Sequence, residues 1–228
     1  MDAMIISVDE PQLNRCVAAV KNQSIPFGRI VHVNNVCPEY RAFNMGMEKV
    51  VGDWVMKVDG DFILNRDAHK IARDYVDGYS DDRCCAFFFG LFDSFLDQNI
   101  GYCAVLRAGL YKKYPYLDKL SNDRKMIDRL RSMGWDALRK NRVILGTHFD
   151  QPDEFQVFKR FYTQRIKYPR DNSIVGILSK RLEKTGDPLY ELGLRAVGFA
   201  NEVKKYPGSH NKVFDEELFE QFMEKHYE

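Results

Sequence analysis

The chain of 228 residues is predicted to be an α/β protein with a mostly parallel sheet flanked by helices, followed by a helical C-terminal part. Over residues 3–61, short apolar runs alternate with segments of helical periodicity, as in a parallel sheet with helices on its faces. From Glu154 onward, apolar residues recur mostly at the 3.6-residue spacing of helices. We therefore expect a core over residues 1–150 and a helical extension over residues 151–228, packed on that core.

Strands and helices alternate through the first half of the expected core. Ala3–Val8 is a short apolar run, which predicts a buried strand, and Pro11 after it suits the first turn of a helix. Arg29–Val33 is a second such run, so we expect a buried strand with His32 as a core residue. The elements expected over this half are strands at 3–8, 29–33 and 54–58 and helices at 13–21, 39–50 and 67–79.

The second half of the chain begins with Cys84–Phe92, which is apolar throughout and too short for a typical free-standing helix. We expect it to be a central strand. Gly134 follows a segment of helical periodicity and is expected to end that helix as a C-cap. The other elements expected are strands at 102–106 and 142–145 and helices at 122–133, 155–168, 174–184, 189–205 and 216–226.

Charge and cysteine content exclude several classes of protein. A formal net charge of +1 gives no reason to expect a nucleic-acid partner. The five cysteines are odd in number and show no CxxC pattern, which favours a reduced, cytoplasmic setting over a disulfide framework or a zinc site. No apolar run approaches the roughly 18 residues of a transmembrane helix, and no signal peptide is evident. Peripheral membrane contact stays open.

A pair of carboxylates follows the predicted strand Trp54–Val58. Asp59 and Asp61 are two residues apart, so on extended backbone their side chains point the same way and can reach one divalent cation. Carboxylate oxygens suit Mg²⁺ or Mn²⁺, and open α/β sheets bind ligands at the carboxyl ends of their strands. The alternative is an ordinary turn, because Asp and Gly are common turn residues.

Several motifs around this pair occur in the order and spacing of a known family. They are Gln23-Ser24 after the first helix, Asn44-Met45-Gly46 in the second, Gly52-Asp53 before the third strand and the DxD motif Asp59-Gly60-Asp61 after it. This set resembles the GT-A fold, in particular the family-two group of nucleotide-diphosphosugar transferases. The resemblance is strong over residues 3–66 and thinner beyond. It implies a metal-dependent, hexosyltransferase-like enzyme that moves a sugar from a nucleotide-diphosphate donor, such as a UDP-sugar, to a hydroxyl acceptor with inversion.

The resemblance also implies roles for individual residues. The metal, Mn²⁺ or Mg²⁺, would be bound by Asp59, Asp61 and His148. The nucleotide sugar would be bound by Ser7, Asp9, Asn34, Asn44, Asp59 and Gly60. Asp123 stands at the position of the general base that deprotonates the acceptor hydroxyl.

The residues themselves leave alternatives open. Asp123, like Ser121 and Asn122, can cap a helix N-terminus, and Asp118 is the nearest substitute as a base. A histidine just past a strand, such as His148, is often structural.

The chain also departs from the family pattern. Asn34-Asn35 stands where these enzymes usually carry aspartates, and Ala42-Phe43 precedes Asn44 where Ala-Arg is common. The Gln-x-x-Arg-Trp element of processive synthases is absent. A second hypothesis is therefore a nucleotide-sugar-binding protein of the same fold with weak or no turnover. A DxD phosphohydrolase fits less well, because Phe62-Ile63 follows the second aspartate.

Overall fold

The computed structural model describes residues 1–119, 122–148, 152–203 and 212–227. The chain divides into two compact units. The first holds Met1–Asp118 and Asn122–Asp150, and the second consists mainly of the residues after Asp150. How the helical extension packs on the core stays a prediction. No helix in the described ranges combines the length and the apolar character that crossing a membrane requires.

The first unit is built on a sheet whose described strands follow the order β2-β1-β3-β6-β5-β7-β4. β1 pairs in parallel with β2 and β3, and β5 pairs in parallel with β7. β6 and β4 run antiparallel to their neighbours. The sheet is therefore mostly parallel, as predicted. The strands are β1 Asp2–Ser7, β2 Ile30–Asn34, β3 Trp54–Asp59, β4 Phe62–Leu64, β5 Cys84–Asp93, β6 Gln98–Arg107 and β7 Asp136–His148.

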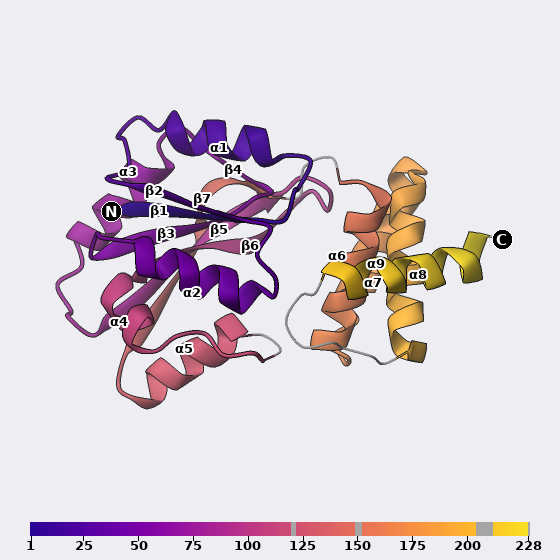
Figure 1. The fold of residues 1–228 in the computed structure, drawn as a ribbon. Coiled ribbons are helices and arrows are strands. Elements are labelled where there is room, and N and C mark those ends of the chain that lie inside the picture. The colour runs from indigo at the N-terminus through magenta and orange to yellow at the C-terminus, as the bar shows by residue number, and fades with distance from the viewer. Residues whose placement is uncertain (120–121, 149–151, 204–211, 228) are drawn as a thin grey trace. The chain divides into compact units, whose positions relative to one another are not determined.

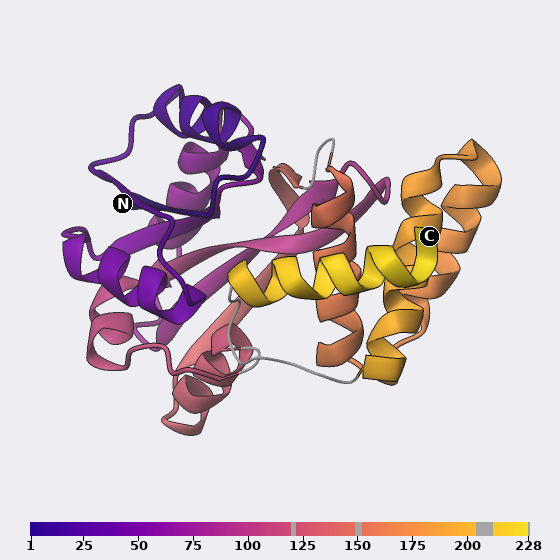
Figure 2. The same cartoon turned by 45° about the vertical axis from the view of Figure 1, so that its right-hand side comes forward.

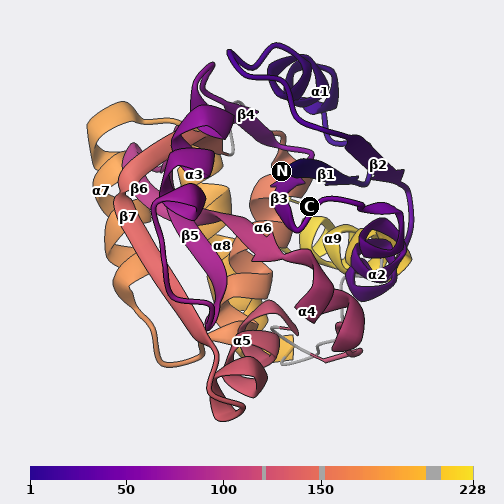
Figure 3. The same cartoon turned by 90° about the vertical axis from the view of Figure 1, so that its left-hand side faces the viewer.

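Helices cover both faces of this sheet (Figure 1). Successive residues of β1 point to opposite faces, so Ile5 enters the core beneath α1 and α3, and Met4 enters the core beneath α2, α4 and α5. Figure 3 shows the twist of the sheet, with β5 and β7 turned well away from the direction of β1 and β2. The helices are α1 Leu13–Lys21, α2 Glu39–Lys49, α3 Ala68–Asp77, α4 Ala108–Lys113 and α5 Asn122–Ser132.

Three parts of the sheet differ from the sequence-based expectation. β2 lies at the sheet edge and buries only alternate residues, so His32 is exposed and its expected place in the core is wrong. The short elements β4 and α4 were not expected, because neither is long enough to show a clear period. β7 starts at Asp136, earlier than expected, and its first half is largely polar and partly exposed.

The second unit consists of helices, as predicted. They are α6 Glu154–Lys167, α7 Ser173–Thr185, α8 Pro188–Val203 and α9 Lys212–Tyr227. α6 begins with a capping box between Asp153 and Gln156. Its Phe158 ring lies 4.8 Å from Phe222 of α9 and 6.1 Å from Phe199 of α8. Figure 2 shows α9 running across α6 and α8. Residues 204–205, the expected end of the third helix, lie outside the described residues.

The five cysteines are free thiols. Cys16, Cys84, Cys85 and Cys103 are buried, and Cys37, just before α2, is partly exposed. Burial, with smaller contributions from Asp61 and Asp59, raises the pKa of Cys16 to about 12. The thiol of Cys16 therefore stays protonated at neutral pH.

Two glycines of α8 provide a matched test of packing in the helical unit. A Cβ on Gly193 would lie 2.9 Å from the Phe161 ring of α6, whereas nothing lies within 4 Å of a Cβ on Gly198. We expect Gly193→Ala to lower the free energy of unfolding by about 1–3 kcal/mol through overpacking. Gly198→Ala should raise it by up to about 1 kcal/mol through helix propensity. Urea denaturation of both variants checks this, and equal effects would contradict the packing.

Candidate functional site

The DxD motif occupies the tight connection between β3 and β4. β3 ends at Asp59 and β4 begins at Phe62, and the Gly60 N–H donates to the Ile6 carbonyl of β1 at 2.9 Å. A Cβ on Gly60 would collide with the Glu10 carboxylate and lie 2.8 Å from the Cβ of Ser7. The absence of a side chain at Gly60 therefore lets the motif lie directly against the end of β1.

Asp61 and His148 meet at this edge of the sheet. The Nε2 atom of His148 lies 3.2 Å from Oδ2 of Asp61, and its Nδ1 atom lies 3.2 Å from Oδ2 of Asp93. Asp93 is fully buried, and its Oδ1 accepts a hydrogen bond from the Leu96 N–H at 2.8 Å. Asp93 ends β5 and His148 ends β7, and the two are direct partners in the parallel pairing of these strands.

Asp59 takes a different partner from Asp61. Lys57 Nζ donates to Asp59 Oδ1 at 2.6 Å and lies 3.7 Å from Oε1 of Glu39, the first residue of α2. Burial alone would lower the pKa of Lys57, but the carboxylates of Asp59 and Glu39 outweigh it and raise that pKa. Lys57 therefore stays charged and holds the Asp59 carboxylate.

Glu10 adds a further carboxylate to the edge. Its Oε2 accepts a hydrogen bond from the Val8 N–H at 2.9 Å. Burial raises the pKa of Glu10, and the negative charges of Asp61 and Asp59 raise it further. The three acidic side chains are thus close enough to disfavour one another's ionisation, and a cation at this edge would relieve that repulsion.

A polar network joins the carboxyl ends of β1 and β2. The Ser7 hydroxyl donates to Oδ1 of Asn34 at 2.6 Å, so His32 Nε2, at 2.8 Å from the same hydroxyl oxygen, is the donor to it. The amides of Asn34 and Asn35 donate to Asp9 Oδ1 and Oδ2 at 3.3 and 2.6 Å. Asp9 has a left-handed backbone with φ 62°, which such a network can hold. The predicted residues Ser7, Asp9 and Asn34 are therefore gathered in one place.

Asn44 is engaged elsewhere. Its Nδ2 donates to the Tyr116 carbonyl at 3.0 Å, and its Oδ1 accepts from the Tyr116 N–H at 3.0 Å. Both ends of the amide thus fasten α2 to the segment between α4 and α5. This geometry supports a positioning role for Asn44, and its contact with the nucleotide stays a prediction.

Asp123 lies in the first turn of α5 with an exposed side chain, and its N–H donates to Oδ1 of Asn122 at 2.8 Å. Burial and then the charge of Asp123 raise the pKa of Tyr116, and Asp123 also contributes to the raised pKa of Lys57. The charge of Asp123 therefore acts on both Tyr116 and Lys57. Ser121, the alternative helix cap, lies outside the described residues.

The residues at this edge fit a divalent cation only in part as they stand. Within the described ranges, no three His, Cys, Asp or Glu side chains form a group able to hold a metal. Asp61 and His148 offer a carboxylate and an imidazole together, whereas Oδ1 of Asp59 is paired with Lys57. Carboxylate oxygens with one imidazole suit Mn²⁺ better than Mg²⁺.

Sequence reasoning missed Lys57, Glu10 and Asp93. Lys57 stands two residues before Asp59 on the same strand, so alternation along β3 could have placed it on the same face. Asp93 directly follows the apolar run of β5, and the rule that placed Asp59 at a strand end applies equally there. Glu10 lies in the turn after β1, where an acidic residue gives no signal of a site.

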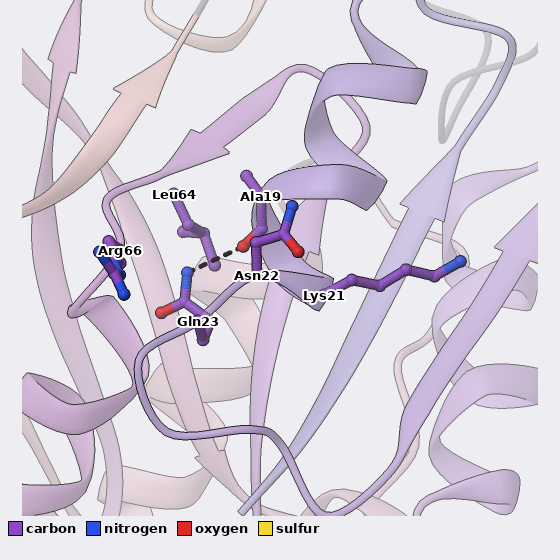
Figure 4. Close-up of a pocket in the computed structure, with 6 residues that line it drawn as sticks. All are labelled: Ala19, Lys21, Asn22, Gln23, Leu64 and Arg66. Carbon is purple, nitrogen blue, oxygen red and sulfur yellow. Dashed lines mark hydrogen bonds between the residues drawn. The ribbon is translucent and has the colours of Figure 1, made fainter.

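A separate cavity of about 560 Å³ lies at the C-terminal end of α1 and contains none of the predicted site residues (Figure 4). Gln23 there donates to the carbonyls of Ala19 and Asn65 and accepts from the His69 N–H. Its amide therefore serves to join α1, β4 and α3. The lining residues are Ala19, Lys21, Asn22, Gln23, Leu64 and Arg66.

Comparison with models of known protein families finds no match, and comparison of the sequence with curated proteins finds none. Solved structures are similar. The mannosyltransferase PcManGT from Pyrobaculum calidifontis, in complex with GDP-Man and Mn²⁺, matches with a TM-score of 0.53 and 13% identity, over 96% of this chain and 78% of that one. Residues 1–349 of S. aureus TarS with UDP-GlcNAc match with a TM-score of 0.51 and 11% identity, over 86% and 72%. The chain has the GT-A fold.

The GT-A fold agrees with the arrangement of the polar residues in the first unit. Ser7, Asp59 and His148 end strands β1, β3 and β7, which all run in the same direction. They therefore lie along the carboxyl edge of the sheet, where open α/β sheets bind their ligands. The candidate site is this edge of the sheet. The cavity at the C-terminal end of α1 is not part of it.

The two hydrogen bonds between the Asn44 amide and the Tyr116 backbone can be tested by substitution. Asn44→Ala removes two hydrogen bonds and should lower the free energy of unfolding by about 2 kcal/mol, at about 1 kcal/mol for each bond. Urea denaturation measures this, and Glu48→Ala, on an exposed position of the same helix, is the control. An Asn44→Ala variant as stable as the control would contradict a stabilising role of these two hydrogen bonds.

Proposed function

We propose that this protein is a metal-dependent glycosyltransferase that moves a sugar from a nucleoside-diphosphate donor, such as a UDP-sugar, to an acceptor hydroxyl with inversion. The observation that carries the proposal is the meeting of Asp61 and His148, 3.2 Å apart, at the carboxyl edge of a GT-A sheet. Two proteins of similar fold support it, because one was solved with GDP-Man and Mn²⁺ and the other with UDP-GlcNAc.

The reaction must neutralise the diphosphate that leaves the sugar. Asp61 and His148 would hold a divalent cation, which when bound supplies Lewis-acid stabilisation to the diphosphate. Lys57 keeps a positive charge beside Asp59 at the same edge. Because the Asp59 carboxylate is already paired, Lys57 limits the repulsion that it would exert on an incoming anion.

The nucleotide base would bind where β1 and β2 end. Asp9 is held there by Asn34 and Asn35, with its carboxylate exposed. Each carboxylate oxygen can accept more than one hydrogen bond, so Asp9 can also accept the imide N–H of a uracil. The network through Ser7 fixes the direction of the Asn34 amide and so presents Asp9 in a defined orientation.

Asp123 is the residue proposed to take the proton of the acceptor hydroxyl. Its carboxylate is exposed at the start of α5 and acts electrostatically on Lys57, which contacts Asp59. A carboxylate placed there can take the proton of an acceptor hydroxyl as a general base. The acceptor would then bind between α5 and the donor.

Donor binding should depend on Asp61. We expect UDP or GDP to bind the wild-type protein in the presence of Mn²⁺, and Asp61→Asn to weaken that binding by at least about tenfold, or about 1.4 kcal/mol. Isothermal titration calorimetry with and without Mn²⁺ measures this. Asp77→Asn, at a carboxylate that is 64% exposed on α3, is the matched control. Absence of Mn²⁺-dependent nucleotide binding to the wild type would refute the proposal.

Turnover should depend on Asp123. We expect Asp123→Asn to lower the rate of sugar transfer or donor hydrolysis by about 10²–10⁴-fold, because the general base is lost, with nucleotide affinity unchanged. A nucleotide-release assay with several donor sugars measures the rate. If the wild type binds the nucleotide but turns over none of these donors, the second hypothesis, a nucleotide-sugar-binding protein, is favoured. The pairing of Asp59 with Lys57 is the observation that favours that alternative.

A further inference from the structure

His148 is held from two sides, which fixes the direction of its ring. The buried Asp93 carboxylate lies 3.2 Å from Nδ1 on the β5 side. On the β4 side, the Phe62 ring lies 5.2 Å from the imidazole at an angle of 88°. These contacts follow from the strand pairing, since His148 is the partner of both Asp93 and Phe62 in the sheet.

The two carboxylates that face His148 differ in their access to solvent. Asp61 is 19% exposed and His148 is 21% exposed, whereas Asp93 is fully buried. The side chains of Asp61 and His148 are therefore in part open to solvent, whereas that of Asp93 is closed to it. An ionised carboxylate only accepts hydrogen bonds, so Asp93 in that form would keep a proton on Nδ1 of His148.

We propose that Asp93 is the positioning residue of this site, which keeps the proton of His148 on Nδ1 and directs the lone pair of Nε2 to a divalent cation shared with Asp61. This inference rests on the proposed function, because it assigns a cation to that site. Metal-binding histidines generally donate their second N–H to such a carboxylate or carbonyl, and loss of that partner weakens metal binding about 10–100-fold.

Replacement of Asp93 by asparagine should change the tautomer of His148. The Leu96 N–H needs an acceptor, and Oδ1 of Asp93 now serves it. In Asp93→Asn the amide oxygen takes that place, which turns the amide NH₂ toward Nδ1 of His148. Nδ1 must then be the acceptor, and the single proton of the neutral ring moves to Nε2. The variant keeps the shape of the side chain and loses the nitrogen that would bind the cation.

The experiment compares Mn²⁺ binding by the wild type, Asp93→Asn and His148→Ala. Calorimetry gives the affinity, and pulsed electron paramagnetic resonance detects the nitrogen of a coordinated imidazole. We expect the wild type to show the nitrogen coupling and Asp93→Asn to lose it, with affinity about 10–100-fold weaker. Asp77→Asn, on an exposed position of α3, should behave as the wild type.

A double variant separates positioning from a general loss of structure. If Asp93 acts through His148, adding Asp93→Asn to His148→Ala should change the remaining Mn²⁺ affinity by less than about twofold. A residue that only supported the fold would lower the affinity again in that background. If adding Asp93→Asn to His148→Ala lowers the Mn²⁺ affinity by as much as Asp93→Asn does in the wild type, the inference is overturned.

The outcomes for the wild type distinguish this inference from the proposed function. If the wild type binds no Mn²⁺, both fail. If it binds Mn²⁺ without nitrogen coupling, or if Asp93→Asn keeps full affinity and coupling, the role of Asp93 is overturned and the metal dependence stands. Nitrogen-15 NMR of the wild type loaded with diamagnetic Zn²⁺ needs no variant. It should find the proton on Nδ1 of His148, and a metal on Nδ1 would overturn the inference.

Discussion

The candidate site depends on strand β7 being paired on both sides at its last described residue. β5 pairs with β7 in parallel and brings Asp93 to His148, and β4 pairs antiparallel and brings Phe62 to the same residue. Asp61 directly precedes β4, so this pairing sets the distance from Asp61 to His148. β4 has only three residues and can approach β7 closely, because Gly146 has no side chain and a Cβ there would lie 2.9 Å from the Cα of Leu64.

The carboxylates at this edge are partly buried close to one another, which disfavours their ionised forms. Burial and the charges of its neighbours raise the pKa of Asp59 despite the ammonium of Lys57. Burial and the charges of Asp61 and Asp59 likewise raise the pKa of Glu10, against the backbone hydrogen bonds that lower it. Lys57 offsets part of this repulsion from within the sheet, and any cation that binds the native state would offset more and stabilise the fold by mass action. Ligand binding and folding stability should therefore be coupled in this unit.

The sequence predicted the alternation of strands and helices and the location of the carboxylate pair, because each of those elements carries a clear apolar period. It did not predict β4 or α4, which are three and six residues long, or the polar first half of β7. Contacts that side chains make with residues distant in sequence could not be predicted either. Asn44 bonds to Tyr116 across 72 residues of sequence, and that pairing depends on how the chain folds back on itself.

The distribution of the thiols has a practical consequence. Four of the five cysteines are buried, whereas Cys37 is partly exposed and lies two residues before Glu39, which approaches Lys57. A thiol-directed fluorophore would therefore attach at Cys37 in the native protein. The natural sequence thus carries its own attachment point for an optical reporter beside the Lys57–Asp59 pair. Changes in emission on adding cation or nucleotide could then be followed without engineering a new labelling position.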